Sequence, residues 1–388
     1  MFPIFQSNDS LLAVILVMVA FSLWVQKFKP FRAIGPAMTV IILGILLVNT
    51  HIVASGAEIY GVVQTYCVPI SISIYLLNVD LKEVMKMSKQ PLMAIASAVF
   101  CVALTATIFG LVFAGGIHEG WKVAGMFVGT YTGGSGNLTA IATGLNASGE
   151  TIAAANAADY VVGMPAMLLM FAAPALMKAS KKWNKFWPYH FKEEELLDDA
   201  EHHELLGSED WSIRDIAFLL AISTSIVALA TKVSVIVFPE SFSSAGRILA
   251  ISTLSIIVAQ HPAVKKLKGN LNLGLFFGMM FLAVIGFAVN LSGFFGSAAA
   301  ITLFCLCVIA GSTLLHLFIT RLLKIRYEYV LLGIVGAIAD GTTAALVASG
   351  AKWNSLINIG LLMGIMGAVC GNYVGIGVAY LIKLLIGA

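Results

Sequence analysis

Residues 121–145 read WKVAGMFVGTYTGGSGNLTAIATGL, an apolar stretch of membrane length that is interrupted in its middle. The interruption is the run Thr132-Gly133-Gly134-Ser135-Gly136-Asn137. Glycine weakens a helix, and Ser and Asn side chains offer the backbone competing hydrogen bonds. At membrane depth, non-helical backbone survives only where it is buried in protein or lines a cavity. The run therefore predicts the tip of a broken helix or re-entrant hairpin, and one half of a binding site.

The composition of the chain indicates an all-α integral membrane protein. Hydrophobic residues make up 59% of the 388 residues and charged residues 11%, whereas a soluble domain carries about 25% charged residues. Apolar stretches of about 18 residues or more, long enough to span a bilayer as a helix, recur along the chain. We expect a multi-pass protein of the cell membrane (inner or plasma membrane), with the lipid bilayer as a partner.

Twelve apolar segments can be traced, six on each side of a polar stretch. They cover residues 11–27, 33–50, 57–79, 91–115, 121–145 and 150–177 in the first half, and 213–237, 244–260, 270–291, 297–320, 328–350 and 354–386 in the second. We therefore divide the chain into a first repeat (1–178), a linker (179–212) and a second repeat (213–388).

The positions of Lys and Arg set the expected orientation, because cytoplasmic loops are enriched in these residues. Basic clusters lie between the first two segments, after the third segment, and from Lys178 to Lys192. All three are cytoplasmic only if the N-terminus is outside and 121–145 enters and leaves the membrane on the same side. The basic clusters of the second half are also cytoplasmic if 328–350 is a hairpin that enters from the cytoplasm. The linker 179–212 is then a cytoplasmic loop.

The two halves are therefore expected to form an inverted repeat, the plan of many secondary transporters. Each half would contain five transmembrane helices and one Gly-rich re-entrant hairpin or broken helix. Three short matches recur in the same order at nearly constant spacing, which chance does not readily produce. They pair Asn78–Leu81 with Ala288–Leu291, Ala142–Gly144 with Ala348–Gly350, and Asp159–Gly163 with Asn372–Gly375.

Ionisable residues deep in a membrane are costly, so they are candidates for function. Among the acidic residues, Asp159 and Asp340 lie well inside apolar segments, and Asp340 belongs to the second break with Gly341, Thr342 and Thr343. We expect Asp159 and Asp340, together with the uncharged Asn156 and Asn372, to couple Na⁺ or H⁺. A Na⁺ site is expected at Asp159 or Asp340.

The helix that follows each break should point its N-terminus, with its partial positive charge, into the protein. Helix N-termini bind carboxylate and phosphate groups through their free amides. The residues expected to contact a solute in this way are Thr132, Gly133, Gly134, Ser135, Gly136 and Asn137 in the first break, and Gly341, Thr342 and Thr343 in the second.

Three motifs, Gly129–Asn137, Ala158–Gly163 and Ala339–Ala345, resemble the YjcL-like membrane proteins, a domain-of-unknown-function family, over nearly the whole chain. That family is placed in the cation:proton antiporter and anion transporter superfamily, with glutamate:Na⁺ symporters and 2-hydroxycarboxylate transporters. In those two groups, Gly-rich hairpin tips bind substrate and Na⁺ in a mobile core domain. The resemblance implies the same roles for Thr132–Asn137 and Asp340–Thr343, a homodimer and an elevator-like movement. The second tip departs from the family pattern, because Ala-Asp-Gly-Thr replaces a Gly-Gly pair.

These features predict an ion-coupled secondary transporter working by alternating access. Its cargo would be a small carboxylate-bearing solute, with amino acids, hydroxy acids and short peptides all open. The alternative is a cation/proton antiporter without an organic substrate. A channel or a membrane-embedded enzyme is less favoured, because neither pore-lining repeats nor a His-Glu-x-x-His motif is present. No G-x-x-x-x-G-K motif for a nucleotide occurs either. We expect no enzymatic activity, no cofactor and no nucleic-acid partner.

Overall fold

The computed structural model describes residues 3–28, 31, 36–196, 211–288 and 291–387, and the regular elements among them are all helices. The first half contains α1 (Asn8–Trp24), η1 (Val25–Lys27), α3 (Pro36–Asn49), α4 (Glu58–Leu76), α5 (Leu81–Lys86), α6 (Lys89–Phe113), η2 (Ala114–Gly116), α7 (Gly120–Gly133), α8 (Ser135–Gly144) and α9 (Gly149–Ala179). The linker contains α10 (Lys181–Phe186) and α11 (Glu193–Leu196). The second half contains α12 (Ile213–Val237), α13 (Glu240–Ala259), α14 (Asn270–Phe287), α15 (Leu291–Leu322), α16 (Tyr327–Ile338), α17 (Gly341–Gly350), η3 (Asn354–Leu356) and α18 (Ile357–Ile386).

Nine helices within these described ranges are long and apolar enough to cross a membrane. The prediction of an all-α, multi-pass integral membrane protein is therefore confirmed. Both predicted helix breaks are also present. The first separates α7 from α8 at Gly134, and the second separates α16 from α17 at Ala339 and Asp340.

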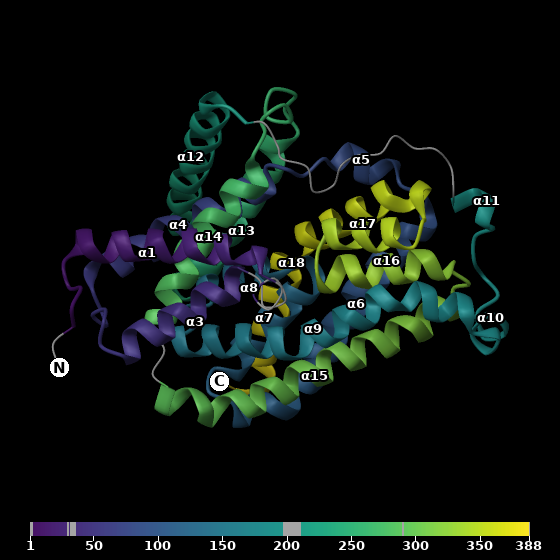
Figure 1. Cartoon of the computed structure of the whole chain (residues 1–388), viewed down its shortest axis with the longest axis horizontal. Coiled ribbons are helices and arrows are strands. Elements are labelled where there is room, and N and C mark those ends of the chain that lie inside the picture. Colours follow the sequence, from purple (N-terminus) through teal and green to yellow (C-terminus); the bar gives the residue numbers. More distant parts are fainter. Residues whose placement is uncertain (1–2, 29–30, 32–35, 197–210, 289–290, 388) are drawn as a thin grey trace.

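The helices pack into two bundles, and each bundle draws on both halves of the chain (Figure 1). Bundle A consists of α1, α3 and α4 with α12, α13 and α14, where α14 packs most extensively against α4 and α3. Bundle B consists of α6 to α9 with α15 to α18, where α18 packs most extensively against α7. The first three apolar segments of each half thus enter bundle A and the last three enter bundle B. Among the described helices, the two bundles therefore do not coincide with the two halves of the chain.

The pair α7 and α8 forms a helical hairpin whose two ends meet, called hairpin 1 below. At its mouth the Glu119 carboxylate accepts the Ser148 backbone amide at 2.8 Å, and Lys122 donates to the Asn146 carbonyl at 2.7 Å. Near its tip, a methyl group built on Gly129 would lie 3.2 Å from the Asn137 carbonyl oxygen. The contacts of Glu119 and Lys122, at the start of α7, with Asn146 and Ser148, just after α8, show that the chain enters and leaves hairpin 1 at the same end.

The pair α16 and α17 forms a second hairpin, hairpin 2, whose mouth lies against the linker. The rings of Tyr327, at the start of α16, and Trp353, just after α17, have centroids 5.9 Å apart. The Tyr327 amide donates to the Tyr189 carbonyl at 3.0 Å, and the Trp187 indole donates to the Ile325 carbonyl at 3.0 Å. The Glu328 carboxylate, 1% exposed, accepts the Phe191 amide at 3.1 Å. Linker residues 187–191 therefore hold the mouth of hairpin 2.

Helix α9 connects the mouth of hairpin 1 to the linker. With 31 residues at about 1.5 Å each, it is about 46 Å long. Figure 1 shows α10 and α11 together at one end of the molecule, beside α16. The two hairpins therefore open at opposite ends, and their tips meet between those ends: a methyl group built on Gly134 would lie 2.5 Å from the Ala339 carbonyl oxygen.

Both tips rest on one helix, α18, through a row of glycines. A methyl group on Gly364 would overlap the Gly341 backbone nitrogen, and one on Gly367 would overlap the Thr132 carbonyl oxygen. Gly371 faces the Asn137 side chain in the same way. Small residues let helix backbones approach closely inside a membrane. The glycine row therefore explains how one helix can contact both tips.

On the linker side, Asp80 and Lys265 join the loops that follow α4 and precede α14. The Asp80 carboxylate accepts the backbone amide of Lys82 at the start of α5 and pairs with the Lys265 ammonium group. The hydrogen bond from Lys265 is the largest effect that holds the pKa of Asp80 below its usual range. This contact ties α4 and α14 together at one end of bundle A.

Candidate functional site

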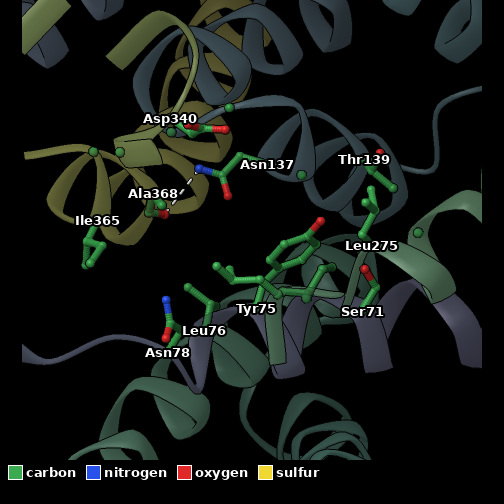
Figure 2. A pocket seen from close by; sticks show the side chains of 18 of the residues that line it. Ser71, Tyr75, Leu76, Asn78, Asn137, Thr139, Leu275, Asp340, Ile365 and Ala368 are labelled. Carbon is green, nitrogen blue, oxygen red and sulfur yellow. Dashed lines mark hydrogen bonds between the residues drawn. The ribbon is translucent and has the colours of Figure 1, made fainter. Parts of the chain in front are cut away.

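A cavity of about 250 Å³ lies between the two hairpin tips and bundle A. One wall is made by Gly133, Gly134, Gly136 and Asn137 of hairpin 1 and by Ala339, Asp340 and Gly341 of hairpin 2, backed by α18. Helices α4 and α14 make the opposite wall, as Figure 2 shows for Asn137 and Asp340 on one side and Ser71, Tyr75 and Leu76 on the other. The cavity is therefore a meeting point of both breaks and both bundles.

The backbone conformation of Gly134 creates the first tip. Gly134 has φ 89° and ψ 172°, a combination that side-chain-bearing residues essentially do not adopt. Helix α7 ends immediately before it and α8 starts immediately after it. The Asn137 side chain then fixes the tip on α18 by donating to the Ala368 carbonyl at 3.2 Å. Its amide oxygen has no hydrogen-bond partner among the described residues and is turned to the cavity (Figure 2).

The second tip is built around Asp340. One carboxylate oxygen accepts the Thr343 backbone amide at 2.6 Å, so Asp340 caps the start of α17. Asp340 is nevertheless exposed and lines the cavity. Its side chain is the one charged group in the lining that the described ranges contribute. The Ala-Asp-Gly-Thr sequence at this tip thus places an acid where the first tip has none.

The structure brings most of the predicted site residues together and separates others from the cavity. Those that line it are Gly133, Gly134, Gly136, Asn137, Asn156, Asp340 and Gly341. Thr132 lies behind the tip, where its hydroxyl donates to the Val128 carbonyl at 2.8 Å. Thr343 contributes its amide to Asp340. The side chains of Ser135 and Thr342 lie outside the described part, as do residues 289 and 290 of the first sequence match.

Asp159 lies one helical turn beyond Asn156 on α9, outside the described cavity lining. It is half-buried, and its carboxylate lies close to the Tyr131 hydroxyl of hairpin 1. The same hydroxyl lies 2.8 Å from the Cys305 sulfur of α15. Asp159 therefore joins α9 to hairpin 1 behind the tip, and its role in ion coupling stays a prediction.

Asn372 lies at the contact between the two bundles. It is 1% exposed, and its amide nitrogen donates to the Ser252 hydroxyl of α13 at 3.0 Å. Its amide oxygen is buried without a partner among the residues the structure describes. The neighbouring Tyr373 hydroxyl lies 2.8 Å from the Thr253 hydroxyl, also on α13. Asn372 thus bridges bundles A and B rather than lining the cavity.

The sequence interpretation missed the wall contributed by bundle A. Ser71, Tyr75 and Asn78 line the cavity from α4 and the turn after it, spaced four and three residues apart. Residues at this spacing share one face of a helix. These polar residues form a stripe in an otherwise apolar segment, and that stripe could have indicated that α4 lines the cavity. The α14 wall is apolar and gave no comparable signal.

The fold and the cavity together define a multi-pass α-helical membrane protein with a pocket at its paired helix breaks. The chain belongs to the family described as "Protein of unknown function (DUF819)", which matches residues 13–385. It is similar to the uncharacterized membrane protein YjcL of Bacillus subtilis (strain 168), with 26% identity over 367 residues that cover 90% of each chain. The predicted membership of the YjcL-like family is confirmed, and the wider superfamily placement stays a prediction.

Proposed function

We propose that this protein is an ion-coupled secondary transporter of a small solute, driven by Na⁺ or H⁺ and working by alternating access. The observation that carries the proposal is the cavity at which the tips of two broken helices meet. Discontinuous helices at the interface of two repeats are the usual binding site of secondary transporters. The Asp340 carboxylate and the amides at the start of α8 supply a charged group and hydrogen-bond donors in a mainly apolar pocket.

The proposal includes an inverted repeat with the N-terminus outside, hairpin 1 entering from outside and hairpin 2 from the cytoplasm. Two features support it. The hairpins open at opposite ends of α9, and corresponding segments of the two halves occupy the same bundle. The sliding movement and the homodimer implied by the family resemblance are part of the same proposal. Bundle B, which carries both tips, is the bundle we expect to move relative to bundle A.

Transport itself is tested with the purified protein in proteoliposomes. Uptake of pooled radiolabelled amino acids and hydroxy acids is measured under an imposed inward Na⁺ or H⁺ gradient and compared with protein-free liposomes. Gradient-driven accumulation of one pool supports the proposal. Na⁺ or H⁺ flux without uptake of any pool would instead support the cation/proton antiporter, which the Asp340 carboxylate in the cavity also favours.

Cysteine labelling is expected to place the two hairpin mouths on opposite sides of the membrane. His118→Cys and Glu150→Cys, both at exposed positions around hairpin 1, should react with an impermeant maleimide added outside intact cells. Lys352→Cys, exposed beside hairpin 2, should react only after the cells are opened. The unsubstituted chain gives the background from the native cysteines. Equal labelling of all three positions from outside contradicts the proposed orientation.

Asp159→Asn is expected to remove most of the gradient dependence of uptake. A carboxylate inside a membrane segment is costly to keep unless it exchanges a cation or proton, and Asn can do neither. The measured quantity is the ratio of uptake with and without the imposed gradient. Tyr131→Phe is the matched control, because it removes the neighbouring hydroxyl and leaves the carboxylate. An unchanged ratio in Asp159→Asn excludes this residue from coupling.

A further inference from the structure

The two tips offer opposite chemistry to the cavity, and this asymmetry indicates the class of solute. Building on the proposed transport function, we propose that the cavity binds a zwitterionic amino acid with an apolar side chain. In this arrangement the ammonium group of the amino acid binds Asp340. Its carboxylate binds the first turn of α8.

The N-termini of α8 and α17 differ in whether they are already capped. At α17 the Asp340 carboxylate accepts the Thr343 amide at 2.6 Å, so an anion is in place. At α8 the N-cap residue is Gly134, which has no side chain to cap the helix, and it lines the cavity. Uncapped amides at a helix start, together with the helix dipole, favour a carboxylate. The α8 end is therefore the anion site and the α17 end is not.

Three oxygen atoms of residues in the cavity lining can accept a hydrogen bond from the ligand. Asn137 and Asn156 are 7% and 2% exposed, and in each the amide nitrogen is bonded while the oxygen has no partner among the described residues. The second carboxylate oxygen of Asp340 is likewise free in the described part of the chain. A ligand group that donates hydrogen bonds therefore complements these oxygens better than a group that can only accept. A plain carboxylate has no donor to give, whereas an ammonium group has three.

The other residues of the cavity lining indicate which side chain and which size of solute the cavity accepts. The wall opposite the tips is mainly apolar, with Val68, Ile72, Leu76, Leu271, Leu275 and Met279. No Lys, Arg or His belongs to the described lining, so a second carboxylate on the solute would find no counter-charge. The volume of about 250 Å³ is below the about 300–1,000 Å³ of pockets for drug-sized ligands. These features favour a single apolar amino acid over a dicarboxylate or a peptide.

The test measures the thermal stability of the purified full chain with four probes of related structure. They are L-leucine, 4-methylpentanoate (no ammonium group), 3-methylbutylamine (no carboxylate) and L-glutamate, each in NaCl and in choline chloride. L-Leucine is expected to raise the melting temperature at concentrations about 10- to 100-fold lower than any other probe. The amine and the carboxylate each lack one charge-assisted hydrogen bond, and the second carboxylate of L-glutamate has no counter-charge in the described lining.

Asp340→Asn is the decisive variant, because Asn caps a helix as well as Asp and so keeps the start of α17. It should weaken L-leucine binding by about 10- to 100-fold, whereas Asp9→Asn, at an exposed position on α1, should leave it unchanged. Equal stabilisation by 4-methylpentanoate, stronger stabilisation by L-glutamate, or unchanged L-leucine binding in Asp340→Asn overturns this inference. Those results do not affect the transporter proposal, because uptake in proteoliposomes tests that proposal separately. If none of the four probes raises the melting temperature, the inference is also overturned.

Discussion

Gly364→Ala is expected to lower the stability of the protein by about 2 kcal/mol and to abolish uptake. The added methyl group would overlap the Gly341 backbone nitrogen and α-carbon, which cannot move aside as a flexible side chain could. Overpacking a close contact costs about 1–3 kcal/mol, and only backbone atoms receive this methyl group. Alanine gains about 1 kcal/mol in helix propensity, so the clash still dominates. The measurement is the melting temperature in detergent, followed by uptake in proteoliposomes.

Gly377→Ala on the same helix is the matched control for Gly364→Ala. A methyl group on Gly377 has no neighbouring atom within 4 Å. This variant therefore carries the gain in helix propensity without the clash, and it should be as stable as the original chain or slightly more stable. If both variants melt alike, the contact between α18 and the second tip is not important for the fold.

Gly134→Ala is expected to reduce solute uptake by about tenfold or more, since about 1.4 kcal/mol of lost binding energy corresponds to tenfold in affinity. Two effects act together. The backbone angles of Gly134 cost about 1–3 kcal/mol for a residue with a side chain. The new methyl group would also lie 2.5 Å from the Ala339 carbonyl oxygen and push the two tips apart. The measurement is initial uptake rate over a range of solute concentrations.

Gly56→Ala separates these two effects. Gly56 also has a positive φ, 75°, but a methyl group there meets nothing within 4 Å. It should lose some stability through backbone strain and keep its uptake rate per folded protein. Should Gly134→Ala behave in the same way, the contact between the tips is not required for transport.

Local features of the sequence were sufficient to predict the two breaks. The glycines around Gly134 and the Asp340-Gly341 pair act on their own stretch of backbone, so no knowledge of distant residues was needed. The charge pattern further predicted that each break turns the chain back, and the contacts of Glu119 with Ser148 agree with that prediction. Apolar length alone predicted the helices that form both bundles.

The side-chain environment of each candidate could not be predicted in the same way. Asn156 and Asp159 are one turn apart on α9, yet Asn156 lines the cavity and Asp159 faces Tyr131. Which face of a helix meets the cavity depends on how neighbouring helices are rotated, and a single sequence does not contain that information. The same reason applies to Asn372, which bonds Ser252 across the two bundles.

The mixing of the two halves within each bundle has a consequence for biosynthesis. When residue 212 has been made, α1, α3 and α4 are still without α14, and α7 is still without α18, its most extensive partner. The remaining 176 residues need about 9 to 35 s at about 5–20 residues per second. For that time α7 must stay in the lipid with its packing surface for α18 uncovered, whereas α3 and α4 wait only until α14 is made. The helices of the first half then acquire their final neighbours only from the second half of the chain.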